Sequence, residues 1–159
     1  YHHFPGGKRQ VMAEAVAFAG ARITSDLEQH LQTDPVTGLR GFLGSWRDLL
    51  LGTSFKAGCP VLAAVAEEPL DEDLDDVVAL ANQAFDDWQT QLARSLESNG
   101  IATREAGELA MLLVASVEGA IILSRARRDI SPFNIIAGQL EAILQAALPT
   151  ASVSRNETP

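Results

Sequence analysis

The sequence predicts an all-α fold, a bundle of about six helices. Apolar residues recur at spacings of three and four along most of the chain, and no segment shows a strand pattern. Alanine and leucine dominate over valine, threonine and tyrosine, which favours helix over sheet. Prolines stand at the boundaries of the periodic segments and interrupt none of them. The expected helices cover residues 8–32, 36–51, 60–67, 70–98, 103–128 and 131–149.

The first three helices are separated by residues typical of helix boundaries. Residues 8–32 carry a continuous apolar stripe at helical spacing. Asp34 and Pro35 open the second helix, because the aspartate carboxylate can accept hydrogen bonds from the free amides of the first turn. Pro60 opens the third helix, which is short and rich in alanine.

The last three helices have clear start and stop signals as well. Asn99-Gly100 supplies a left-handed stop for the fourth helix. We expect Thr103 to cap the fifth helix and Ser131 to cap the sixth, because their hydroxyls can accept from first-turn amides.

Composition limits the possible functions. The chain has 159 residues, which fits one domain, and a formal net charge of −9, which argues against nucleic-acid binding by this domain alone. One cysteine, Cys59, excludes an intrachain disulfide and fits a reducing, cytoplasmic setting. The longest apolar run, Leu109 to Leu123, is shorter than a membrane span needs, so no membrane contact is expected.

Three landmarks carry a family resemblance. The start, Tyr1-x-His3-Phe4 with Lys8, resembles the end of the recognition helix in the tetracycline-repressor (TetR) family of transcriptional regulators. The Gly-Cys-Pro turn at 58–60 and the Glu-Gly-Ala stretch at 118–120 resemble the C-terminal domain of the LmrA/YxaF-like branch. The resemblance covers roughly residues 1–148.

The resemblance implies a homodimeric, ligand-responsive repressor, of which this chain holds helices four to nine of the family. Residues 1–7 would be the remnant of the helix-turn-helix, 8–149 the effector-binding and dimerisation domain, and 150–159 a flexible tail. The helix-turn-helix itself would be missing, so operator DNA would be bound by the parent protein. A small, largely apolar effector would shift the first long helix and release the operator.

The family motif places Tyr1 and Lys8 against operator phosphates, because a hydroxyl and an ammonium are suitable donors. The alternative is that both are ordinary surface residues.

Aromatic residues on separate helices are the best candidates for a ligand pocket. Two tryptophans can wall a cavity and offer an indole N–H to a ligand, although aromatic residues at helical spacing more often only fill a core. The predicted ligand-binding residues are Trp46, Leu50, Phe55, Cys59, Val61, Phe85, Trp88, Met111, Val114 and Glu118.

Glu118 and Cys59 each have two interpretations. Glu118 lies within an apolar run, where a carboxylate is costly unless it is paired or protonated. It either lends polarity to the pocket or pairs with an arginine such as Arg47 or Arg125. Cys59 either packs in the core or, at a helix start, acts as a redox sensor.

The fifth and sixth helices carry more apolar surface than one bundle layer can hide, which predicts a homodimer. Gly119 and Ala120 would allow close approach, and the alternative is that both helices face only their own core. The predicted interface consists of Leu113, Val117, Ala120, Ile121, Ser124, Phe133, Ile136, Leu140, Ile143 and Leu144.

No metal site, cofactor or catalytic set is expected. His2 and His3 are adjacent and point different ways on a helix, and the acidic run from Asp71 to Asp76 is typical of a solvated helix start. No Ser-His-Asp set, phosphate loop or paired carboxylates can be assembled from these spacings. The alternative to a ligand-responsive regulator is a dimeric helical interaction module with a packed core and no ligand.

Overall fold

A computed structural model describes residues 5, 7–66 and 75–149 of the chain. The all-α prediction is confirmed, and the helix bounds agree closely with those expected. The expected residues 67 and 70–74 and the tail at 150–159 lie outside the described residues. The helices are α1 (Gly7–His30), α2 (Pro35–Gly52), α3 (Pro60–Ala66), α4 (Asp75–Ser98), α5 (Thr103–Arg127) and α6 (Ser131–Ala147).

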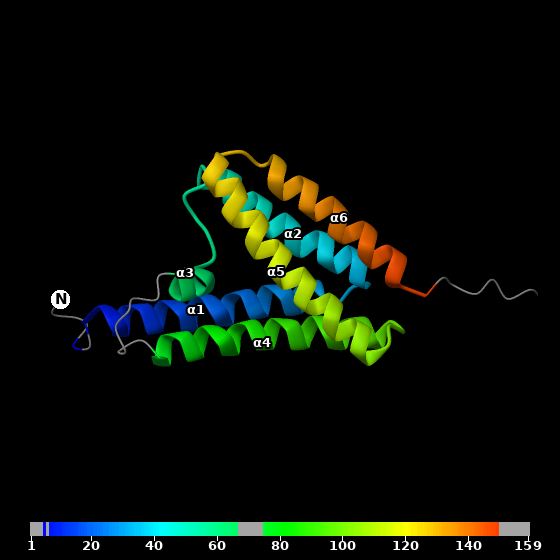
Figure 1. Cartoon of the computed structure of the whole chain (residues 1–159), viewed down its shortest axis with the longest axis horizontal. Coiled ribbons are helices and arrows are strands. Elements are labelled where there is room, and N and C mark those ends of the chain that lie inside the picture. The colour runs from blue at the N-terminus through cyan, green and yellow to red at the C-terminus, as the bar shows by residue number, and fades with distance from the viewer. Residues whose placement is uncertain (1–4, 6, 67–74, 150–159) are drawn as a thin grey trace, which may run out of the picture.

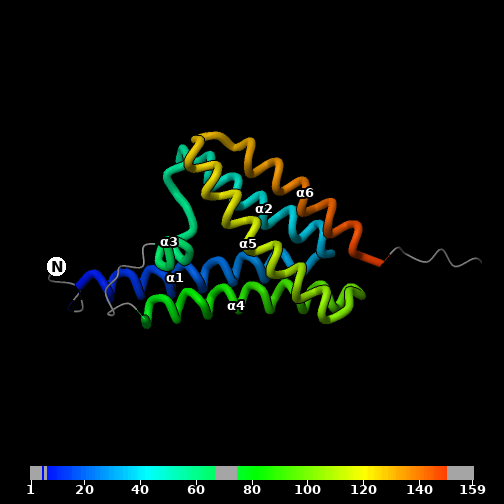
Figure 2. Tube along the Cα trace, in the orientation of Figure 1, coloured from blue at the N-terminus to red at the C-terminus, as the bar shows by residue number. Residues whose placement is uncertain are grey.

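The helices form two layers that diverge toward one end of the molecule (Figure 1). Helices α1 and α4 lie side by side in one layer, and α2, α5 and α6 make the other. Helix α5 slants from the second layer down to the far end of α4, so that it joins the layers, as the chain trace of Figure 2 also shows. The short α3 packs on α1 and α4 where the layers are furthest apart.

The predicted start of α2 is confirmed. The Asp34 side chain accepts a hydrogen bond from the Thr37 amide at 3.0 Å, and Pro35 stands in the first turn. The amide bonds lower the pKa of the Asp34 carboxyl, because they stabilise its charged form. The stop after α4 is also confirmed, since Gly100 has a φ of +92°.

The predicted caps of α5 and α6 are wrong. Both hydroxyl residues, Thr103 and Ser131, lie one position too far along, as the first residue inside each helix. Ala102 occupies the cap of α5 and offers no side-chain acceptor. The turn before α6 is held by Asp129, whose Oδ1 accepts from both the amide and the hydroxyl of Ser131.

Two contacts explain how closely the helices pack. A Cβ added to Gly20 of α1 would lie 3.2 Å from the Cβ of Ala84 on α4, so these helices touch through their smallest side chains. The fully buried Ser124 Oγ of α5 accepts a hydrogen bond of 3.1 Å from the Phe133 amide, which fixes α6 against the end of α5.

Candidate functional site

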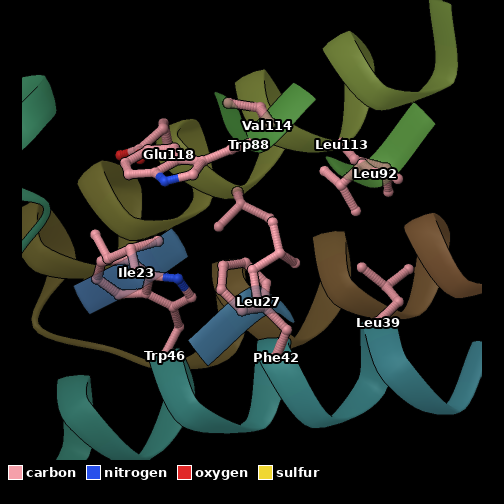
Figure 3. Close-up of a pocket in the computed structure, with 11 residues that line it drawn as sticks. Ile23, Leu27, Leu39, Phe42, Trp46, Trp88, Leu92, Leu113, Val114 and Glu118 are labelled. Carbon is pink, nitrogen blue, oxygen red and sulfur yellow. The ribbon is translucent and has the colours of Figure 1, made fainter. Parts of the chain in front are cut away.

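A small cavity lies between α1, α2, α4 and α5, and side chains from all four helices point into it (Figure 3). Its volume is about 20 Å³, which is room for about one water molecule. Glu118 is the only acidic or basic residue in its lining. The lining consists of Ile23, Leu27, Leu39, Phe42, Trp46, Trp88, Leu92, Leu113, Val114, Val117 and Glu118.

Glu118 is a buried carboxylate with a free oxygen. Its side chain is 8% exposed, and its Oε2 has no hydrogen-bond partner within the part of the chain that the structure describes. Burial raises the pKa of this carboxyl to about 7, and a hydrogen bond from the neighbouring Cys59 thiol offsets only part of that rise. The site therefore holds a group that changes charge near neutral pH.

The predicted arginine pairing of Glu118 is wrong. Arg47 donates to the side chain of Asn134 and lies near Asp48, on the outside of α2. Arg125 donates to the Lys56 carbonyl, in the loop before α3. Both guanidinium groups are thus engaged away from the cavity, which leaves the Glu118 charge without a cationic partner among the described residues.

Cys59 lies beside Glu118 and is buried. Burial and, next, the nearby Glu118 charge raise the pKa of the Cys59 thiol to about 12. A thiol that stays protonated is a poor redox nucleophile, so the packing role is favoured over redox sensing.

The two tryptophans occupy different settings. The Trp88 indole N–H donates to Thr24 Oγ1 at 3.0 Å, and its ring meets Phe85 edge to face with centroids 5.2 Å apart. Trp46 is buried on α2, and its N–H forms no hydrogen bond to any described residue. Trp88 is therefore anchored, whereas Trp46 has a donor free for a ligand.

An open groove of about 640 Å³ runs outside the cavity, between α1 and α2. Its lining is mostly apolar, includes the 70% exposed Phe18, and ends at Gly58 and at Pro60, the first residue of α3. Three side chains, Ile23, Phe42 and Trp46, line both the groove and the cavity. We call these three shared side chains the partition.

The structure brings together some of the predicted ligand-binding residues and not others. Trp46, Trp88, Val114 and Glu118 line the cavity. Leu50, Cys59 and Val61 are buried in the core, and Phe55 and Phe85 are half-buried. Met111 was placed wrongly: it is 61% exposed on the outer side of α5.

Several lining residues were missed by sequence reasoning, although helical spacing could have found them. Leu39 and Phe42 precede Trp46 by seven and four positions, and Leu92 follows Trp88 by four. Ile23 and Leu27 of α1 are likewise four apart, on the apolar stripe of residues 8–32. Leu113 and Val117, which line the cavity as well, were assigned to the dimer interface instead.

The predicted dimer face is turned toward the chain's own core. Ile136 is half-buried, and only Ile143 is exposed among the ten predicted residues. The other eight are buried within the chain: Leu113, Val117, Ala120, Ile121, Ser124, Phe133, Leu140 and Leu144. The opposite face of both helices is apolar too, and its large exposed members are Met111, Leu112, Ile122, Leu123, Ile135 and Ile143.

The remaining predicted sites are outside this region. Tyr1 lies outside the described residues, and Lys8 is exposed in the first turn of α1. Within residues 5, 7–66 and 75–149, no three metal-binding side chains come together. Helix α5 is long and apolar enough to cross a membrane by length and composition, but in this structure it packs between α4 and α6.

Residues 35–139 match a family model described as the C-terminal domain of LmrA/YxaF-like transcriptional regulators. The chain is 36% identical over 155 residues to an uncharacterized HTH-type transcriptional regulator of Mycobacterium tuberculosis strain H37Rv, covering 96% of this chain and 79% of that protein. It is 30% identical over 147 residues to the HTH-type regulator YxaF of Bacillus subtilis strain 168, covering 91% and 76%. It is 28% identical over 152 residues to the HTH-type regulator LmrA of the same strain, covering 91% and 77%.

Proposed function

Since the chain belongs to the LmrA/YxaF-like branch of the TetR family of transcriptional regulators, we propose that it binds a small, largely apolar effector and dimerises to control operator DNA. The cavity between α1, α2, α4 and α5 is the effector site. The observation that carries this proposal is the partition, because its three side chains line both the small apolar cavity and the larger open groove beside it. Rotation of Phe42 and Trp46 would join the two spaces into a site large enough for a small molecule.

Operator DNA is bound by a helix-turn-helix of the kind named in the relatives, joined to the α1 end of this domain in the cytoplasmic regulator. Ile23 and Leu27 of α1 form one wall of the cavity, so an effector that enlarges the cavity presses on α1. Displacement of α1 would change the spacing of the two DNA-binding units in a dimer, and half-site recognition depends on that spacing. Lys8, at the start of α1, contacts phosphate.

The homodimer forms through the outer face of α5 and α6. Large apolar side chains such as Leu123 and Ile135 are exposed there. A Cβ added to Gly119 or Gly138 would meet no atom within 4 Å, so a second helix has room to approach closely at both places. Apolar side chains around small residues are typical of helix pairs that associate face to face.

Tryptophan fluorescence and thermal unfolding test the effector site directly. An apolar compound that enters the cavity changes the emission of Trp46, and the Trp88→Phe variant, which keeps Trp46 as the only tryptophan, shows that change alone. A compound at 100 times its Kd stabilises the domain by about 2.7 kcal/mol, which is about 5 to 10 °C in Tm for this size. Absence of any response across diverse apolar compounds would contradict the effector site.

A charge substitution tests the dimer face. Leu123→Glu places a carboxylate in the proposed interface, and we expect a monomer in analytical ultracentrifugation because a buried unpaired charge is costly. Leu80→Glu is the matched control, since Leu80 is a similarly exposed leucine on α4, away from this face. Dissociation by both variants, or by neither, would contradict the assignment.

The second candidate is a dimeric interaction module with a packed core. The small size of the cavity, about 20 Å³, favours it, because no effector fits without movement of the partition. The same fluorescence experiment separates the two functions: a dimer that responds to no small molecule supports the interaction module.

A further inference from the structure

The cavity contains one polar feature whose chemistry narrows the class of effector. Glu118 lines the cavity, and its buried carboxylate leaves Oε2 without a hydrogen-bond partner among the described residues. A buried oxygen without a partner is uncommon in folded proteins, and each such group calls for a ligand, a water molecule or a functional reason. Here the cavity beside it is otherwise apolar, so a ligand group is the natural partner.

We propose that the effector is an apolar molecule that carries a positively charged nitrogen, bound between the Glu118 carboxylate and the rings of Phe42, Trp46 and Trp88. This inference rests on the proposed effector site and specifies its ligand. A carboxylate together with aromatic faces is the combination that proteins use to bind ammonium groups, because both attract positive charge in a site without water.

Among the described residues, no positively charged side chain lines the cavity beside Glu118, so a ligand can supply the positive charge. From the loop before α3, Cys59 faces Glu118 as a protonated thiol. From α1, Arg22 and Asp26 line the outer groove rather than the cavity. Neither α2 nor α4 contributes an acidic or basic side chain to the cavity. The carboxylate therefore has no positive partner from any helix that forms the cavity.

The net charge of the chain and the groove beside the cavity both favour a cationic ligand. The formal net charge of the chain is −9, which attracts cations to the protein surface. The groove leads from that surface to the partition, and two of its three side chains, Phe42 and Trp46, are aromatic. Aromatic rings attract cations, so Phe42 and Trp46 favour the entry of a cation from the groove.

A matched pair of probes tests the proposal. Benzyltrimethylammonium and neopentylbenzene have nearly the same shape, and only the first is charged. We expect the wild-type chain at pH 8 to bind the cation at least tenfold more tightly, measured by tryptophan fluorescence and calorimetry. Glu118→Gln keeps the shape of the side chain and removes its charge, so this preference should fall to less than about threefold. Glu97→Gln, an exposed change on α4, should keep the preference.

The pH dependence provides a second, independent readout. Because the pKa of Glu118 is about 7, the ionised fraction falls about tenfold between pH 8 and pH 6, and cation affinity should fall with it. The charge of benzyltrimethylammonium does not change in that range, and Glu118→Gln should show no such fall.

The outcomes separate the two proposals. Equal binding of both probes, or binding of neopentylbenzene alone, would overturn the cationic ligand and leave an apolar effector site in place. Cation binding that Glu118→Gln leaves unchanged would also overturn it. Failure of both probes to bind would overturn both the ligand class and the effector site.

Discussion

Replacing Glu118 by glutamine should change how the stability of the protein depends on pH. The pKa of this carboxyl is about 7 in the folded chain and 4.5 as its ordinary value, because burial disfavours the charge. The folded state therefore holds a proton that the unfolded chain releases between those two values. The contribution of Glu118 to stability is greatest below pH 4.5, falls as the pH rises toward 7, and is constant above that.

The magnitude follows from the same two values. At about 1.4 kcal/mol for each pH unit between 4.5 and about 7, the ionised Glu118 costs the fold about 3 kcal/mol at pH 8. Glutamine has no charge to bury, so Glu118→Gln should gain up to about 3 kcal/mol over wild type between pH 4.5 and pH 8. The gain should appear mainly between pH 5 and pH 7.

Urea unfolding at several pH values, at one fixed protein concentration, measures this difference. The difference between Glu118→Gln and wild type is the quantity to compare, since it removes the titration of all other groups. Glu97→Gln on the exposed side of α4 is the control and should follow wild type at every pH. A difference between Glu118→Gln and wild type that stays constant from pH 4.5 to pH 8 would refute the argument that Glu118 is buried without a partner.

Two further substitutions test the packing that positions the cavity. Ser124→Ala removes the acceptor of the buried Phe133 amide and should cost about 1 to 3 kcal/mol in urea unfolding, so an unchanged midpoint would contradict the role of this bond. Gly20→Val forces a larger side chain against Ala84 and should destabilise the chain by about 1 to 3 kcal/mol, measured by calorimetry. Gly44→Val is its control, because a Cβ there meets no atom within 4 Å, and an equal loss in both variants would contradict the close contact of α1 and α4.

The fold was predictable because local signals agree with one another. Helical periodicity, prolines at the boundaries and the turn at Gly100 depend only on nearby residues, and the structure confirms them. The caps of α5 and α6 were misplaced by one residue, since Thr103 and Ser131 are good caps by type but lie inside the helices. Residue type alone does not fix such a boundary.

The site was predictable only in part, and α5 shows why. The tryptophans were found because large aromatic residues are conspicuous. Helix α5, however, is apolar on both its inner and outer faces, so periodicity could not decide which face meets the core. The stripe through Leu113 and Val117 was predicted as the dimer face, whereas these two residues line the cavity. The absence of a partner for Glu118 depends on three-dimensional neighbours that no spacing reveals.

The two faces of α5 also determine which kinds of sequence change the helix can accept. Positions 113, 117 and 118 lie on the inner face of α5 and line the cavity. Positions 112, 119 and 123 lie on its outer face and are exposed. Each residue turns an α-helix by about 100°, so inserting or deleting one residue after position 112 would rotate every later position away from its face. Glu118 would then leave the cavity, and core side chains would turn to the outer face in the same step. Relatives of this chain should therefore differ in residue type along α5 while keeping its length, and an alignment gap between positions 112 and 124 would mark a protein whose α5 no longer presents the same residues to the core.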